Sequence, residues 1–202
     1  MKIICIGRNY ANHAKEMNAE VPKEPMFFMK PETAILKEMN FYYPEFTRDL
    51  HHEVEVVIKI CKVGKHIALE HAKNYYTHIG LGIDFTARDI QRECKEKSHP
   101  WEKAKAFDNS AVISTHFIPK EELELNNINF HLSINSERVQ EGTTSDMLFD
   151  FDTLISNLSQ YITLKTGDLI YSGTPEGVGP VHRGDKVEGF IGDNKMFVIN
   201  IK

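Results

Sequence analysis

The sequence predicts an α+β fold that is mainly β, with a few short helices. Short runs rich in valine and isoleucine alternate with glycine, proline and asparagine, as expected of strands joined by tight connections. Helical periodicity is confined to a few segments, and these do not alternate regularly with strands as a parallel α/β sheet would require. No repeat, low-complexity segment or linker interrupts the chain, so we expect one domain over residues 1–202.

The first part of the chain predicts two strands and a short helix. Residues 2–6 are a β-branched run closed by glycine, which indicates a strand. Residues 25–31 are apolar and bracketed by prolines, which is typical of an edge strand. Residues 10–17 favour a helix, in which His13 and Glu16 are i,i+3 neighbours within hydrogen-bonding reach. A carboxylate beside an imidazole tunes a general base, although an incidental surface pair has the same spacing.

The stretch from 50 to 58 is dense in β-branched residues and predicts a central strand. Side chains alternate faces along a strand, so Glu53 and Glu55 lie on one face, about 6–7 Å apart. Two carboxylates at this separation can share a hard cation such as Mg²⁺, or simply meet water. His51 and His52 lie on opposite faces, and we expect supporting roles for them, not metal ligation.

A second buried strand is predicted over residues 75–85, where glycines indicate a close backbone approach. It ends at Asp84, which is well placed either as a metal ligand or as a capping carboxylate. A helix follows from Thr86 to about Lys97, with Thr86 as its N-cap and Asp89 in its first turn.

Two later segments carry further candidate site residues. Lys105 lies between two alanines, so partial burial is expected, and a buried lysine can hold a carboxylate or stabilise an enolate. Many lysines merely extend from the surface instead. Residues 173–180 form a glycine-rich turn that lacks the lysine of a phosphate-binding loop. Its backbone N–H groups and the Thr174 hydroxyl can face a carboxylate, or the turn can simply connect two strands.

The remaining elements complete the predicted core. Residues 129–141 indicate a β-hairpin, residues 169–172 a strand, and residues 186–191 with 196–201 a closing hairpin. Residues 152–162 predict an amphipathic helix. Its apolar face comprises Leu154, Ile155, Leu158, Tyr161 and Ile162.

Composition narrows the possible partners and compartment. A net charge of −5 argues against nucleic-acid binding. The three cysteines are odd in number and widely spaced, which fits free thiols in a reducing compartment. No signal peptide is evident, and no segment approaches the ~20 apolar residues of a membrane span. We therefore expect a cytoplasmic protein with no membrane partner.

Short motifs spread over nearly the whole chain resemble one family. In chain order they are Gly7–Tyr10 with His13 and Glu16, Phe28–Pro31, His52–Glu55, Asp84–Asp89 with Gln91, Lys105–Asp108, Gln140–Gly142 and Ser172–Pro180. Together they resemble the fumarylacetoacetate hydrolase (FAH) family, in its short acylpyruvase and oxaloacetate decarboxylase type. The resemblance implies a mixed β-roll fold, a single catalytic domain over residues 1–202 and a homodimer.

The resemblance also assigns roles to residues. It implies that Glu53, Glu55 and Asp84 hold Mg²⁺ or Mn²⁺, which agrees with the chemistry of hard oxygen ligands. It implies that the substrate is held by Arg8, Arg88, Gln91, Lys105 and Thr174, and that the catalytic residues are His13, Glu16 and Lys105. The segment of about residues 10–24 resembles the family's lid.

The implied substrates are small 2-oxo acids. We expect cleavage of a C–C bond, by acylpyruvate hydrolysis or oxaloacetate decarboxylation, through a metal-stabilised enolate. The alternatives are an isomerase or tautomerase of oxaloacetate or 2-hydroxyhepta-2,4-diene-1,7-dioate type, and a non-catalytic relative that binds a metal or a partner. The enzymatic interpretation requires that Asp84 faces the glutamate pair and that no lysine or arginine fills the gap between the carboxylates.

Overall fold

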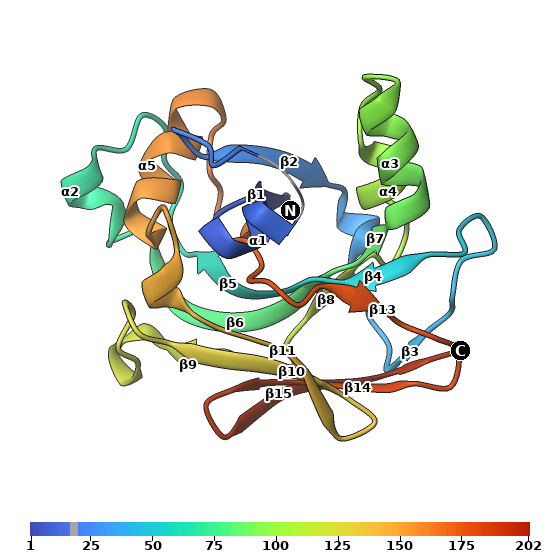
Figure 1. The fold of residues 1–202 in the computed structure, drawn as a ribbon. Helices are drawn as coiled ribbons and strands as arrows, with labels where there is room; N and C mark the ends of the chain where they lie inside the picture. Colours follow the sequence, from blue (N-terminus) through green and yellow to red (C-terminus); the bar gives the residue numbers. More distant parts are fainter. Residues whose placement is uncertain (17–19) are drawn as a thin grey trace.

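Three β-sheets form the framework of the protein in the computed structural model, which describes residues 1–16 and 20–202 (Figure 1). The largest sheet has the order β2 (Met26–Lys30), β1 (Ile3–Gly7), β12 (Leu169–Tyr171), β5 (Val54–Ile60), β6 (Tyr76–Asp84) and β8 (Ala111–Ile113), and β9 (Ile118–Pro119) also pairs with β6. The second has the order β11 (Glu137–Thr143), β10 (Asn129–Ile134), β14 (Lys186–Ile191), β15 (Asn194–Ile201) and β3 (Asn40–Phe41). The third is β13 (Gly179–Pro180), β4 (Leu50–His52) and β7 (Thr86–Ala87). The expected α+β, mainly β fold is confirmed.

The helices are short and lie around the largest sheet. They are α1 (Ala11–Glu16), α2 (Leu69–Ala72), α3 (Arg88–Glu96), α4 (Glu102–Lys105) and α5 (Phe151–Tyr161), and single 3₁₀ turns occur at Glu32–Ala34, Lys120–Glu122 and Thr144–Asp146. Helices α2 and α5 pack together at one end of the molecule and α3 and α4 at the other, with α1 drawn between them (Figure 1). No helix in the described part of the chain is both long and apolar enough to span a membrane.

Alternation along β5 separates the main core from the site. Val56 and Ile58 face the large apolar cluster that the first two sheets enclose with α5. Glu55 and Val57 point to the opposite face, where Val57 joins a smaller cluster with residues of β1 and β12. One face of the strand therefore stabilises the fold, and the other presents a carboxylate.

Three details differ from the sequence-based expectation. The strand predicted over residues 50–58 is interrupted at Glu53, where the chain passes from the third sheet into the largest one. Thr86 does not cap α3, because it lies in β7 and the helix begins at Arg88. Tyr161 is 60% exposed, since it falls in the last turn of α5 beyond the apolar contact of that helix.

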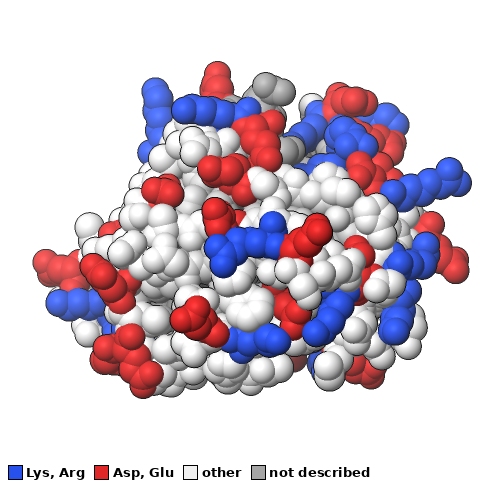
Figure 2. Space-filling view, turned by 60° about the horizontal axis from the view of Figure 1, so that its bottom comes forward, with Lys and Arg blue, Asp and Glu red and all other residues white. Residues whose placement is uncertain are grey.

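Basic and acidic side chains are interspersed on the face that is at the bottom of Figure 1 (Figure 2). They do not gather there into one large field of a single sign. This distribution agrees with the modest net charge of −5.

Candidate active site

Three carboxylates converge at the centre of the molecule because of strand register. Val54 pairs with Ile83, so Glu53 lies opposite Asp84, and the Asp84 N–H donates to the Glu53 carbonyl at 2.9 Å. Glu55 lies on the same face, opposite Gly82. All three side chains are buried, and one carboxylate oxygen from each lies within 4.8 Å of the others. We call Glu53, Glu55 and Asp84 the acidic trio.

Three cationic side chains contact two members of the trio. Lys105 Nζ lies 2.7 Å from Glu53 Oε2 and 2.7 Å from Asp84 Oδ2. Arg88 Nη2 lies 2.6 Å from Glu53 Oε1, and Lys30 Nζ lies 2.7 Å from Asp84 Oδ1. Of the two conditions for the enzymatic interpretation, Asp84 does face the pair. The second condition is not met, because the Lys105 ammonium lies in the gap between Glu53 and Asp84.

The third carboxylate, Glu55, is treated differently. Among the described residues it forms no ion pair, and it accepts a hydrogen bond of 2.7 Å from the backbone N–H of Gly173. Burial and the neighbouring Asp84 and Glu53 charges raise the pKa of Glu55 well above its usual value. Burial alone would also raise the pKa of Glu53, but Lys105 and Arg88 hold it well below its usual range. Negative charge at Glu55 therefore lacks a counterion.

This pattern fits a divalent cation. Carboxylate oxygens are the ligands that Mg²⁺ and Mn²⁺ prefer, and three of them leave coordination positions for a small molecule. Asp84 Oδ1 is buried and accepts no hydrogen bond from the residues that the structure describes, although it lies 2.7 Å from Lys30 Nζ. Lys105 is the competing occupant, so ion binding requires its ammonium to move from between Glu53 and Asp84.

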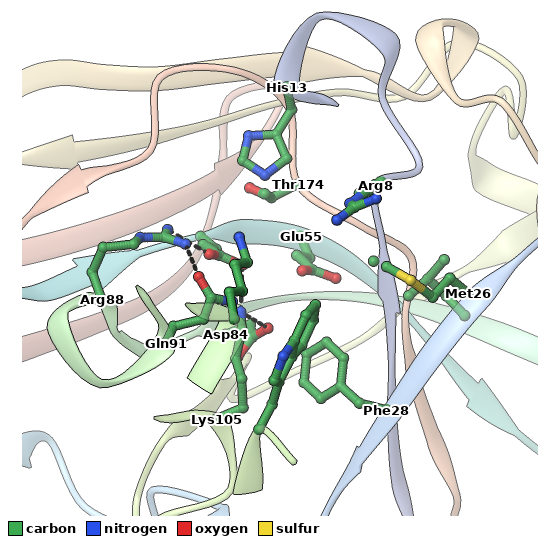
Figure 3. Close-up of a pocket in the computed structure, with 15 residues that line it drawn as sticks. Arg8, His13, Met26, Phe28, Glu55, Asp84, Arg88, Gln91, Lys105 and Thr174 are labelled. Carbon is green, nitrogen blue, oxygen red and sulfur yellow. Dashed lines mark hydrogen bonds and ion pairs between the residues drawn. The ribbon is translucent and has the colours of Figure 1, made fainter. Parts of the chain in front are cut away.

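The expected substrate-binding residues lie in one pocket with the trio (Figure 3). Its lining includes Arg8, Arg88, Gln91, Lys105 and Thr174. Helix α3 places Arg88 and Gln91 one turn apart, and Arg88 Nη1 donates to Gln91 Oε1 at 2.7 Å. Arg88 Nε is buried and has no partner among the described residues, so one donor of this guanidinium remains available for a bound anion.

The Thr174 residue lines the pocket, but its hydroxyl forms hydrogen bonds within the fold. It donates to the Val54 carbonyl at 2.9 Å and accepts from Gln140 Nε2 at 2.7 Å. Its proton is therefore used within the fold and is not presented to a substrate carboxylate. The glycine-rich turn does bind a carboxylate through Gly173 N–H, but that carboxylate is Glu55.

The predicted His13–Glu16 pair forms above the trio. His13 Nδ1 lies 3.0 Å from Glu16 Oε2, and Glu16 Oε1 accepts from the Gly177 N–H at 3.1 Å. His13 is buried and lines the same pocket as the trio (Figure 3). Helix α1 carries both residues, in agreement with the predicted helix. The proposed lid of residues 10–24 includes positions 17–19, which lie outside the described residues.

Sequence reasoning missed two residues that support the trio. Lys30 is buried beside Asp84 and donates to Ser110 Oγ at 3.0 Å and to the Lys105 carbonyl. The available signal was a lysine within an apolar strand. Thr86 Oγ1 donates to Glu53 Oε1 at 3.1 Å, which explains its conformation in a strand instead of a helix cap. No pattern in the sequence distinguishes these two uses of a threonine.

The fold and the pocket define a β-rich protein with a buried acidic centre. Residues 2–201 match the family described as fumarylacetoacetate (FAA) hydrolase C-terminal. The chain belongs to this family.

Relatives and solved structures agree with the family assignment. The chain is 44% identical to "Oxaloacetate tautomerase FAHD1, mitochondrial" of Mus musculus over 191 residues, which are 94% of this chain and 86% of the relative. It is 43% identical to "Oxaloacetate decarboxylase, mitochondrial" of Dictyostelium discoideum over 190 residues, or 93% and 87% of the two chains. The fumarylpyruvate hydrolase of Pseudomonas aeruginosa, solved with Mn²⁺ and pyruvate, superposes with a TM-score of 0.92 at 34% identity, covering 100% of this chain and 89% of that one.

Proposed function

We propose that this protein is a divalent-metal-dependent enzyme that moves a proton at C3 of a small 2-oxo acid. Keto–enol tautomerisation of oxaloacetate is the proposed reaction. The observation that carries the proposal is a His–Glu pair facing three buried carboxylates within one pocket. The name of the 44% identical mouse relative supports the choice of oxaloacetate.

The pocket provides binding groups for the carboxylate of a 2-oxo acid. Arg88 and Gln91 lie side by side on α3, and a free donor on Arg88 suits a carboxylate. A cation held by the trio would supply a Lewis acid for the keto group. When Lys105 leaves its bridge between Glu53 and Asp84, its ammonium can donate to an oxygen of the same substrate.

His13 is the proposed proton carrier. Its Nδ1 faces Glu16, so Nε2 is the ring nitrogen left to exchange a proton with C3 of the substrate. Glu16 is itself held by the Gly177 N–H and fixes the orientation of the ring. General acid–base catalysis of this kind contributes typically about 10²–10⁴-fold.

Cleavage of a C–C bond is the second candidate, and two of the compared proteins favour it. One is named an oxaloacetate decarboxylase and the other a fumarylpyruvate hydrolase. Decarboxylation breaks the C3–C4 bond of oxaloacetate, releases CO₂ and leaves the enolate of pyruvate, without an attacking water. In acylpyruvate hydrolysis, His13 and Glu16 would deprotonate the water that attacks the distal carbonyl.

The test compares three substrates in one purified preparation. Oxaloacetate enol-to-keto conversion, oxaloacetate decarboxylation and acetylpyruvate cleavage are measured with Mg²⁺, with Mn²⁺ and with EDTA. We expect the fastest metal-dependent turnover in the first assay. Faster C–C cleavage would support the second candidate. A folded protein that binds Mn²⁺ but turns over none of the three would contradict both and support a binding role.

A further inference from the structure

Helix α3 carries a second cationic residue, Lys95, toward the pocket. Arg88, Gln91 and Lys95 are spaced by three and four residues, so they lie along one side of the helix, and all three line the pocket. Arg88 contacts the trio, whereas Lys95 lies about 6 Å further along the helix axis than Gln91, at the exposed rim. Arg88, Gln91 and Lys95 therefore form a row that runs from the acidic trio to the exposed rim of the pocket, which we call its mouth.

Lys95 and Arg8 lack acidic partners. Neither forms an ion pair with a carboxylate of the described residues, and the nearby Glu93 pairs with Lys97 instead, at 2.6 Å. The Lys95 ammonium lies 5.7 Å from the centroid of the Trp101 ring. Burial and the neighbouring Arg88 and Arg8 charges lower the pKa of Lys95, and the Glu53 charge opposes them only in part.

A count of the formal charges shows an excess of positive charge at the mouth of the pocket. The formal charges of the three carboxylates and of Lys30, Arg88 and Lys105 sum to zero, although these cations contact only Glu53 and Asp84. Arg8 and Lys95 add two positive charges, and a divalent cation would add two more. A substrate with a single carboxylate would leave most of this excess uncompensated, whereas a dianion with carboxylates at both ends would reduce it at both places.

We propose that Lys95, assisted by Arg8, binds the distal carboxylate of a dicarboxylic 2-oxo acid and thereby selects it over 2-oxo acids with neutral tails. This inference rests on the proposed function, with Arg88 and Gln91 binding the carboxylate next to the keto group. Lys95 lies one helical turn beyond Gln91 toward the exposed rim, so the two carboxylates of the acid would be held at successive turns of α3. Met26, Phe28 and Trp101 line the same pocket and supply apolar contacts for the carbon skeleton between the two carboxylates.

The test uses two non-reacting acids that differ by one carboxylate, L-malate and L-lactate. Trp101 is the only tryptophan and lines the pocket, so its fluorescence reports binding without turnover. We expect the wild type with Mn²⁺ to bind malate more tightly than lactate. Lys95→Met should weaken malate binding about tenfold and leave lactate binding unchanged, because one charge-assisted contact is lost. Lys95→Arg should keep most of the preference.

Lys97→Met is the matched control, since Lys97 lies on the same helix, is exposed and pairs with Glu93. It should leave both affinities unchanged. In kinetics, Lys95→Met should lower kcat/KM for oxaloacetate about tenfold but not for acetylpyruvate. Equal loss for malate and lactate, no effect of Lys95→Met on malate, or a wild type without preference for malate would overturn the inference. Absence of turnover of every 2-oxo acid would instead count against the proposed function, because the binding comparison needs no reaction.

Discussion

Glu55 differs from its two neighbours in the trio because no cation in the described part of the chain pairs with it. Its only hydrogen-bond partner among the described residues is the Gly173 N–H, and burial with two nearby carboxylates disfavours its charge. A buried carboxylate without a counterion costs stability unless something positive reaches it. A bound cation would supply this missing counterion. We therefore expect Glu55, more than Glu53 or Asp84, to determine how much a bound cation stabilises the folded protein.

Glu55→Gln tests this directly. We expect Mn²⁺ or Mg²⁺ to stabilise the wild type, by about 2.7 kcal/mol at a concentration of 100 times Kd, and to have little effect on the variant. Without metal the variant should be as stable as the wild type or more so, because glutamine can still accept from Gly173 and carries no charge. Thermal unfolding with and without metal measures both effects. Glu141→Gln, at an exposed residue paired with Arg138, is the control. Equal metal stabilisation of Glu55→Gln would contradict the assignment.

His13→Ala should separate binding from proton transfer. We expect oxaloacetate tautomerisation to fall by about 10²–10⁴-fold, since the variant lacks the imidazole that exchanges the proton. Acylpyruvate hydrolysis should fall far more than decarboxylation, because only hydrolysis needs an activated water. Malate binding should remain. His71→Ala, at an exposed residue of α2, is the control. Equal losses of hydrolysis and decarboxylation would reject this division of roles.

At the scale of elements, Asp89 ties the start of α3 to the loop before β4. Its carboxylate accepts from Thr47 Oγ1 at 2.6 Å and from the Arg48 N–H at 3.0 Å, and it also caps the Ile90 N–H. Partial burial alone would raise the pKa of Asp89, but these hydrogen bonds lower it. The contact positions the helix that carries Arg88 and Gln91 toward the pocket.

Asp89→Asn should therefore lower stability in a pH-dependent way. Because the pKa is lower in the folded state, the unfolded state binds more protons, and the stabilisation is present above about pH 3.8 and is lost as pH falls. We expect a loss of about 1 kcal/mol near pH 7, shrinking toward zero in acid. Urea unfolding across this range measures it, with Asp193→Asn in an exposed turn as the control. A difference that does not change with pH would show that charge is not involved.

Gly173, in the turn after β12, is required for two reasons: a positive φ angle and a close approach to Asn9. Its φ is +102°, and a Cβ there would lie 2.7 Å from Asn9 Cβ. Gly173→Ala should lower the free energy of unfolding by about 1–3 kcal/mol because of backbone strain. The clash with Asn9 should also displace the Gly173 N–H that donates to Glu55, so the affinity for the metal should fall as well. Gly184 has a φ of +99° and open space around it, so Gly184→Ala isolates the strain. Calorimetric Mn²⁺ titration and urea unfolding of both variants provide the comparison. Equal metal affinity in the two would contradict the role of this turn.

Local periodicity predicted the elements well, but long-range pairing decided where some of them end. Alternation was enough to place Glu53 and Glu55 on one face, and prolines were enough to mark β2 as an edge strand. The break at Glu53 depends on pairing of β4 with β7 and β13, which are distant in the chain. Thr86 likewise follows its contact with Glu53, not its capping propensity.

At the scale of the whole molecule, the family resemblance predicted the mixed β-roll, and the structural comparison agrees with it. The candidate site was predictable where chemistry follows spacing, as for His13 with Glu16. It was not predictable where a side chain contacts a residue that is distant in the sequence, as for Lys30 beside Asp84 or the Thr174 hydroxyl that donates to the Val54 carbonyl. Sequence spacing says nothing about which polar groups the fold uses internally.

The oligomeric state also belongs to this scale. The expected homodimer stays a prediction, and light scattering after size exclusion should give twice the 23.2 kDa of one chain, or about 46 kDa. A mass of one chain at micromolar concentration would contradict it. The compartment stays a prediction as well, since the mouse and Dictyostelium relatives are both named as mitochondrial.

The acidic trio and the His13–Glu16 pair, which face each other across the pocket, are supported by very different parts of the fold. Glu55 and Asp84 lie in strands of the largest sheet and Glu53 lies directly before one of them. His13, in contrast, lies on a six-residue helix whose Glu16 accepts from one backbone N–H. Changes in that helix can therefore accumulate during divergence without disturbing the acidic trio. Such a scaffold can exchange one reaction for another on the same bound molecule, which would account for neighbours that bear the names tautomerase, decarboxylase and hydrolase.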